Sequence, residues 1–397
     1  PCAFAATAGH DVVGMGCQRA RVAARLLLLH AAAAAASTVR KEDSWDYYPQ
    51  RPVGLGWLNW TDHFRPGQLY RASSVIGISD SNLLIADCFN NRLQIASLHD
   101  DKKRHYQILG GYGVKPGTFL RPNGLASNGK HVFVSDSHNH RIQKMSLPDF
   151  IFQETAGSYG TGAGQLNFPS ALAIIDDSLY VADTRNHRIS VYNLDLVYQF
   201  SFGARGNSPG NFSFPEGIAA SSSKAGSKGG IYVVDSGNDR LQVFTPSGEF
   251  VRVIGESGVD PGQFDYPISV ATLGSRLYVS EWGGKRVQVL TPKGEVLHVL
   301  KMRYGQMGHL SGIYVTMRHV YVIDWDRNGI HVLLRVRRKA KTESGDDDAE
   351  ATPATLAATS SQPSSSGAAD AAKAQPASKT PKGFGKRKNG GKRKTSA

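Results

Sequence analysis

The sequence predicts an all-β fold, a six-bladed β-propeller, because one marker recurs along it with a nearly constant period. The marker is D-x-x-N-x-R-[IL], and it is present in four full copies that begin at Asp87, Asp136, Asp183 and Asp235 and in two altered copies that begin at Glu281 and Asp324. These acidic residues lie 49, 47, 52, 46 and 43 positions apart. A period of about 40 to 50 residues with short apolar runs is typical of four-stranded propeller blades.

A second marker, Gly-x-[Leu/Phe], precedes each acidic residue by 16 to 25 positions and fixes the number of blades at six. Its glycines are Gly67, Gly117, Gly164, Gly210, Gly262 and Gly308, and four copies continue to a proline at Pro122, Pro169, Pro215 and Pro267. In the fourth blade, alternating apolar and β-branched residues predict strands at 217–220, 231–234, 241–244 and 250–254. The insertion at 221–230 falls on the face opposite the marker hairpins.

The two ends of the chain are expected to close the ring. Arg65-Pro-Gly matches Lys115-Pro-Gly and Asp260-Pro-Gly, so residues 53–60 are expected to form the outer strand of the sixth blade and to remove its open edge. The predicted organisation is a poorly ordered leader and linker at 1–52 and a propeller at 53–339. A disordered low-complexity tail with a basic terminus follows at 340–397.

The net charge of +13 is concentrated at the ends of the chain, with 14 basic and 6 acidic residues at 335–397 and 5 basic and 1 acidic at 1–41. The body is therefore nearly neutral. The leader, Arg19 to Ala36, fits a secretory or organelle signal, whereas the basic clusters at 386–388 and 392–394 fit a nuclear or nucleic-acid-binding tail, so the compartment stays open. The apolar run at 26–36 is too short to span a bilayer, and no stable membrane insertion is expected.

The repeats resemble those of the NHL-repeat family, whose N-x-R-[IL]-Q segment follows a strand-ending Asp and whose members fold as six-bladed propellers. The resemblance covers residues 53–336. It implies protein-binding or RNA-binding platforms, substrate-recognition modules of ubiquitin ligases, or a lyase. The chain's three cysteines are too few for the zinc domain of a ligase.

The lyase resemblance requires zinc-binding histidines directly after the inner-strand proline. The corresponding residues here are not histidines: Asn123, Ser170, Glu216 and Ile268, with Ser73 and Ser311 in the two blades that lack the proline. The lactonase-like relatives need several carboxylates and Asn around a divalent metal, and only Glu216 and Asn123 fit. The sequence therefore predicts no metal, no cofactor and no enzyme activity.

The acidic and basic members of the marker are predicted to be structural. A carboxylate that ends the second strand can accept hydrogen bonds from a guanidinium five residues on and so fix the hairpin. The predicted pairs are Asp87 with Arg92, Asp136 with Arg141, Asp183 with Arg188, Asp235 with Arg240, and Glu281 with Arg286.

A group of basic and aromatic residues in the second and third blades allows three interpretations. Its members are Tyr112, His138, His140, Tyr159, Arg185 and His187. Histidines in adjacent hairpins could bind zinc, and basic residues with aromatics between them are typical of single-stranded RNA binding. An ordinary polar rim is the third interpretation.

The last two blades depart from the pattern together. Trp282 and Trp325 follow the acidic residue, Gly284 replaces the hairpin Asn, and Gly329 replaces the Arg. The indoles either fill space left by the lost side chains or form an exposed binding patch flanked by Lys285 and Asp326. The sequence as a whole predicts a monomeric, non-enzymatic scaffold that binds protein, with RNA binding as the alternative and a metal-dependent enzyme third.

Overall fold

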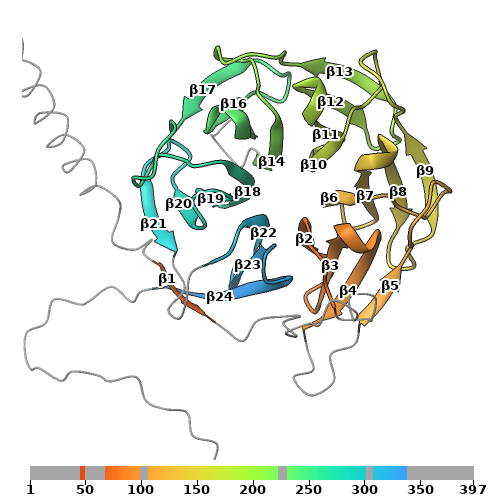
Figure 1. The fold of residues 1–397 in the computed structure, drawn as a ribbon, viewed down its shortest axis with the longest axis horizontal. Coiled ribbons are helices and arrows are strands. Elements are labelled where there is room, and N and C mark those ends of the chain that lie inside the picture. Colours follow the sequence, from red (N-terminus) through yellow and green to blue (C-terminus); the bar gives the residue numbers. More distant parts are fainter. Residues whose placement is uncertain (1–44, 50–67, 99–105, 222–229, 301–306, 338–397) are drawn as a thin grey trace, which may run out of the picture. The chain divides into compact units, whose positions relative to one another are not determined.

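The computed structural model describes residues 45–49, 68–98, 106–221, 230–300 and 307–337. Within these residues the chain forms six antiparallel four-stranded sheets, which Figure 1 shows arranged as blades around a central axis. The predicted all-β, six-bladed propeller is confirmed. The predicted tail at 340–397 and most of the predicted leader lie outside the described residues.

Each blade runs from an inner strand at the axis to an outer strand at the rim. The first blade contains β2 (Ser74–Gly77), β3 (Asn82–Asp87), β4 (Arg92–Ser97) and β5 (Tyr106–Leu109). The second contains β6 (Pro122–Ser127), β7 (His131–Asp136), β8 (Arg141–Ser146) and β9 (Phe152–Ala156). The third contains β10 (Pro169–Ile175), β11 (Ser178–Asp183), β12 (Arg188–Asn193) and β13 (Tyr198–Phe202).

The second half of the ring repeats this order. The fourth blade contains β14 (Pro215–Ser221), β15 (Gly230–Asp235), β16 (Arg240–Phe244) and β17 (Phe250–Ile254), as the sequence predicts. The fifth contains β18 (Pro267–Leu273), β19 (Arg276–Glu281), β20 (Val287–Leu290) and β21 (Val296–Leu300). The sixth contains β22 (Leu310–Val315), β23 (His319–Asp324), β24 (Gly329–Arg337) and β1 (Trp45–Pro49).

One-turn 3-10 helices connect the second and third strands of the first four blades: η3 (Cys88–Asn90), η4 (Ser137–Asn139), η5 (Thr184–Asn186) and η6 (Ser236–Asn238). In five blades the first residue of the inner strand pairs with the acid that ends the second strand, as Pro169 does with Asp183, and in the first blade Ser74 pairs with Ala86, the residue before the acid. The hairpins and the beginnings of the inner strands therefore share one face of the ring, which we call the hairpin face.

An N-terminal strand closes the ring, but it is not the strand that the sequence predicts. β1 pairs antiparallel with β24, from Trp45 opposite Arg337 to Pro49 opposite Leu333. The predicted segment, 53–60, lies outside the described residues. The prediction failed because it assumed the usual short spacing to the next Pro-Gly turn: β17 ends at Ile254 before Pro261, whereas β1 ends at Pro49 and the matching proline is Pro66.

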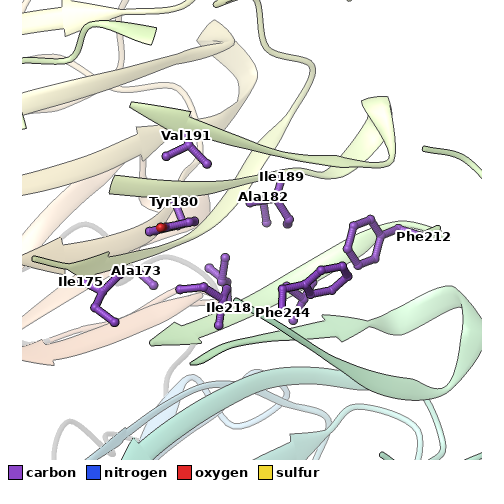
Figure 2. Close-up of a cluster of buried hydrophobic side chains, with 11 residues drawn as sticks. Ala173, Ile175, Tyr180, Ala182, Ile189, Val191, Phe212, Ile218 and Phe244 are labelled. Carbon is purple, nitrogen blue, oxygen red and sulfur yellow. The ribbon is translucent and has the colours of Figure 1, made fainter. Parts of the chain in front are cut away.

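The hydrophobic core is divided among the interfaces between blades. Six clusters of buried side chains each join two neighbouring blades of the described chain. Figure 2 shows the cluster between the third and fourth blades, where Phe212 and Phe244 of the fourth face Tyr180 and Ile189 of the third. Because each blade packs on two others, the whole ring is needed for complete burial.

A buried carboxylate joins the parts of each blade at the hairpin face. In the second blade, Asp136 Oδ2 accepts hydrogen bonds from Arg141 Nε (2.8 Å), Asn139 Nδ2 (2.8 Å) and Gln143 Nε2 (3.0 Å). Asp136 Oδ1 accepts one from the amide of Leu120 at 2.7 Å. The Arg141 guanidinium in turn donates to three carbonyl groups of the loop that leads into the blade. The carboxylate therefore fixes the hairpin and this loop together.

The same ion pair is present in four other blades at 2.7 to 2.8 Å: Asp87 with Arg92, Asp183 with Arg188, Asp235 with Arg240, and Glu281 with Arg286. In the sixth blade, where Gly329 replaces the arginine, Arg327 Nη1 and His331 Nε2 each lie 2.8 Å from Asp324 Oδ2. All six carboxylates are fully buried.

Replacing Asp136 with alanine should lower the free energy of unfolding by about 3 to 5 kcal/mol, because it leaves Arg141 charged without its buried partner. Asp195→Ala is the control, since Asp195 pairs with Lys144 at 2.9 Å but its side chain is 80% exposed. That change should cost less than about 1 kcal/mol. Urea denaturation measures both, and equal losses would contradict the structural role of the buried carboxylate.

Candidate functional site

A cavity of about 400 Å³ occupies the centre of the ring at the hairpin face. All six blades contribute to its lining, through the beginnings of the inner strands and through the hairpins. The aromatic and charged side chains of the lining are Phe89, Arg121, His138, Phe168, Arg185, Phe214, Glu216, Trp282 and Trp325. The cavity is therefore lined by aromatic rings and by a few charged groups.

Serine hydroxyl groups on the channel wall connect neighbouring blades. Ser73 Oγ donates to the carbonyl of Asn123 at 2.8 Å, and Ser170 Oγ to that of Glu216 at 2.7 Å. Ser311 Oγ donates to the carbonyl of Ala72 at 3.0 Å. These hydroxyls occupy the positions at which the resemblance to the lyases places zinc ligands, so the residues present do not fit a metal. Within the described ranges, no three His, Cys, Asp or Glu side chains are grouped to hold one.

A residue that we call the lead-in residue stands immediately before the proline position of each inner strand. The lead-in residues are Arg71, Arg121, Phe168, Phe214, Tyr266 and His309. The first five have left-handed backbone conformations, with φ between 46° and 52°. Such a conformation costs a non-glycine residue on the order of 1 to 3 kcal/mol, and such residues cluster at functional sites. Five large side chains are thus held at the channel mouth in a conformation that glycine would adopt more easily.

Hydrogen bonds across the blade boundaries hold the lead-in residues in place. The amides of the first five donate to the fourth residue after the acid in the preceding blade's hairpin, whereas the amide of His309 donates to Asp326 of its own blade at 3.0 Å. The pairs are Arg71 to Asn328 (2.8 Å), Arg121 to Asn91 (2.9 Å), Phe168 to His140 (3.2 Å), Phe214 to His187 (3.1 Å) and Tyr266 to Asp239 (2.8 Å). The hairpin of one blade thereby positions the lead-in residue of the next.

Three guanidinium groups stack on aromatic rings around the mouth. The guanidinium carbon of Arg71 lies 3.9 Å from the ring centroid of Trp325, that of Arg121 lies 4.3 Å from Phe89, and that of Arg185 lies 3.9 Å from Phe168. Among the residues described, none of the three has a carboxylate within 4.0 Å. In the described part of the chain, each is therefore a cation that rests on an aromatic ring rather than in an ion pair.

Trp282 and Trp325 lie together at the mouth. Their ring centroids are 4.8 Å apart in an edge-to-face arrangement, and Trp282 also stacks on His309 at 4.8 Å. Both indoles are half-buried. His309 Nδ1 is 2.8 Å from Asp326 Oδ2, whereas Lys285 is exposed. The two tryptophans form one aromatic surface that lines the cavity.

The indoles do not fill the spaces left by the altered hairpins. A Cβ atom at Gly284 would collide with the carboxylate of Glu281, which is one methylene longer than the Asp of the other blades and occupies that space. At Gly329 the lost arginine is replaced by Arg327 and His331 on Asp324. In both hairpins, side chains other than the indoles replace the lost contacts. The two indoles line the cavity.

The six residues of the predicted RNA-binding rim are only partly brought together. Arg185, His138 and His140 all contact Phe168, with ring centroids 4.8 and 4.7 Å away for the two histidines, and Tyr159 lies 4.9 Å from His140. His187 packs against Phe214 at 4.5 Å. Tyr112 lies on a connecting loop and is 77% exposed.

The histidines at the blade boundaries have a structural contact. Nδ1 of His140 and Nδ1 of His187 each accept an amide hydrogen bond, which requires that nitrogen to be unprotonated. Burial lowers the pKa of both imidazoles, and nearby arginine charge lowers it further. Burial, with the charges of Arg121, His140 and Arg185, also lowers the pKa of His138 to about 4. These imidazoles are therefore neutral at physiological pH.

Glu216 is the carboxyl group of the channel. Burial raises its pKa to about 7, although the Ser170 hydroxyl and the charge of Arg185 act in the opposite direction. Near neutral pH this group exchanges between its protonated and charged forms. Burial raises the pKa of Tyr266, the lead-in residue of the next blade, and the charges of Glu216 and Asp239 raise it further.

The lead-in residues and Phe89 are the members of the site that the sequence analysis missed. The signal was present: a large side chain stands before the proline in Arg121-Pro, Phe168-Pro, Phe214-Pro and Tyr266-Pro. Its meaning depends on the left-handed backbone and on contacts between blades, which a repeat alignment does not show.

A family model for the NHL repeat matches residues 119–145 and 166–192. These segments span the second and third blades, from the lead-in loop to the hairpin and the third strand. The chain carries NHL repeats in a six-bladed propeller. Among curated proteins, none matches the sequence. In the described part of this NHL-repeat chain, no helix has the length and apolar character needed to cross a membrane.

Several solved structures share the propeller fold of this NHL-repeat protein. Virginiamycin B lyase from Staphylococcus aureus is 16% identical, with a TM-score of 0.50 over 73% of this chain and 99% of the other. A gluconolactonase from Xanthomonas campestris is 13% identical, with a TM-score of 0.50 over 73% and 98%. A Bacteroides thetaiotaomicron protein of unknown function is 14% identical, with a TM-score of 0.54 over 74% and 77%. At these identities the likeness shows the fold alone.

These structures correct the expectation that the protein is not an enzyme. Two of the propellers it resembles are a lyase and a gluconolactonase, so this architecture supports catalysis in other proteins. The residues after the inner-strand prolines argue only against the zinc site of the lyases. The prediction of no enzyme activity was wrong because it took the absence of that one site as evidence against catalysis of any kind.

Replacing Glu216 with glutamine should stabilise the NHL-repeat propeller at high pH only. The folded state holds the Glu216 proton up to about pH 7, whereas an unfolded glutamate releases it near about pH 4.3. Wild-type stability should therefore fall, relative to E216Q, as the pH rises through this window, and the difference should be constant above it. Melting temperatures of both proteins from pH 4 to pH 9 measure this.

The exposed Glu249 offers a matched control, E249Q, which should show no such dependence on pH. A difference between E216Q and wild type that is the same at every pH would contradict the raised pKa.

Proposed function

We propose that the protein binds a partner protein through the channel mouth, which we define as the lead-in residues with Phe89, Arg185, Trp282 and Trp325. The NHL resemblance supports this function, because propellers of that kind serve as protein-binding platforms. Tryptophan and arginine are the residues most enriched among binding hot spots, which lie in central pockets surrounded by a polar rim. Both residue types meet at this mouth.

The observation that carries the proposal is the position of Trp282 and Trp325. The altered hairpins are completed by Glu281, Arg327 and His331, so packing in the hairpins does not explain the indoles. Two further aromatic side chains are partly open beside them, since Phe214 is 42% exposed and Tyr266 is 40% exposed. A group of open aromatic rings at a concave centre supports a binding function.

The test compares binding with folding in Trp282→Ala and Trp325→Ala. A photo-crosslinking amino acid placed at the exposed Lys285 first captures the partner in cells, and the purified partner is then titrated against each variant. Because half-buried indoles bury less than core residues, each variant should lose less than about 2 kcal/mol of stability, against 3 to 5 for a core tryptophan. Partner affinity should fall by about 2 kcal/mol, roughly 30-fold.

Phe250→Ala provides the control, because Phe250 is an exposed aromatic residue, 39% accessible, on the outer strand β17. It should leave partner affinity unchanged. An unchanged affinity in both tryptophan variants, or a loss of 3 to 5 kcal/mol of stability in each, would return the indoles to a packing role.

A further inference from the structure

The cations at the channel mouth have one open side each. Aromatic rings cover a face of the guanidinium groups of Arg121 and Arg185, at 4.3 Å and 3.9 Å, which leaves their in-plane N–H groups available. Neither group has a carboxylate partner among the described residues. A guanidinium group that rests on a ring can still offer its fork of N–H donors, which binds a carboxylate through two parallel hydrogen bonds.

Resting on the proposed function, we infer that the partner presents an acidic peptide segment to the channel mouth. An Asp or Glu side chain of that segment binds Arg121 and Arg185, and a neighbouring apolar side chain packs on Trp282 and Trp325. All four residues line the same cavity. A volume of about 400 Å³ is near the lower end for ligand pockets, so it accommodates one or two side chains of a segment and excludes a folded domain.

His138 lies beside both arginines. Its ring is 4.8 Å from that of Phe168, which also carries Arg185, and its amide donates to the carbonyl of Leu120, the residue before Arg121. Burial and the two arginine charges lower the pKa of His138, so its imidazole is neutral. The channel wall between Arg121 and Arg185 therefore offers two cations and one neutral imidazole to an incoming anion. Glu216 lines the same cavity, but burial raises its pKa to about 7 and it lies more than 4.0 Å from both guanidinium groups, so an incoming carboxylate can pair with them directly.

The distribution of charge favours an acidic peptide over RNA. Stacking of successive bases needs several open ring faces, but Arg71, Arg121 and Arg185 each already lie over one ring, on Trp325, Phe89 and Phe168. Of the rings at the mouth, Phe214 and Tyr266 are the more exposed. The carboxylates of Asp239 and Asp326 lie at the amides of the lead-in residues Tyr266 and His309, beside the mouth in the last blades. A chain of phosphates across the mouth would meet these carboxylates, whereas a peptide confines its negative charge to the arginine side.

Fluorescence anisotropy with synthetic peptides tests this inference on the full chain. The probe is a fluorescein-labelled nonapeptide with Glu-Phe-Asp at its centre, acetylated and amidated at its ends. We expect saturable binding, at least 10-fold weaker binding when the centre is Gln-Phe-Asn, and at least 10-fold weaker binding when it is Glu-Gly-Asp. The second comparison tests the aromatic half of the site and the first tests the arginine half.

Variants of the protein assign the charge. Arg121→Ala and Arg185→Ala should each weaken binding of the acidic peptide at least 10-fold, while Arg318→Ala, an exposed arginine between β22 and β23, should leave it unchanged. Arg185→Lys keeps the charge but loses the planar fork, and it should weaken binding several-fold. The melting temperature of each variant shows that the loss of binding is not a loss of folding.

Three results would overturn the inference: equal binding of the acidic and neutral peptides, binding of the neutral peptide only when its C-terminal carboxylate is free, or tighter binding of a nine-nucleotide uridine RNA that depends on the same arginines. The proposed function fails on a different result. If the tryptophan variants still bind the captured partner, partner binding at the mouth is wrong. If they lose the partner but acidic peptides do not bind, only the acidic chemistry is wrong.

Discussion

The buried carboxylate that ends the second strand is the interaction on which the rest of this structure depends. It joins the hairpin, the third strand and the lead-in loop of its own blade through four hydrogen bonds in the second blade. The hairpin that it fixes then holds the next blade's lead-in residue, as Asn91 holds Arg121. A charge buried for stability within one blade therefore sets the position of a side chain at the channel mouth of the next.

The sequence predicts the parts of the fold that repeat. Six copies of two markers identify the blades and the acid–arginine pairs, because every copy reports the same local geometry and the copies reinforce one another. The strand that closes the ring occurs only once in the chain, so its position cannot be checked against other copies. The sequence analysis therefore places β1, Trp45–Pro49, in the leader. The lead-in residues were missed for a related reason. Their identity varies from blade to blade, and a position that varies among repeats looks like one where any side chain is tolerated.

The tryptophans show where local reasoning reaches its limit. Sequence alone allows Trp282 to fill the space opened by Gly284, because the two changes occur together. The structure shows that Glu281 fills it, through one additional methylene group that brings its carboxylate over Gly284. Two substitutions in one hairpin compensate each other, and the third, the indole, remains available for binding. Distinguishing these roles requires the positions of side chains.

The channel mouth combines features that are usually separate in a small site. Arginines stacked on aromatic rings adjoin a tryptophan pair, since Arg71 lies over Trp325, and Glu216, with its pKa raised by burial, lines the same cavity. Other proteins with this fold carry enzyme activities, and a buried carboxyl group with a raised pKa in the same cavity as arginine side chains is a feature of many functional sites.

A crystal structure of the protein with the Glu-Phe-Asp peptide tests the central claim most directly. A carboxylate of the peptide should lie about 3 Å from guanidinium nitrogens of Arg121 and Arg185, with the phenyl ring against Trp282 and Trp325. A peptide bound on the outer strands or on the face opposite the hairpins, with the channel mouth unoccupied, would contradict it.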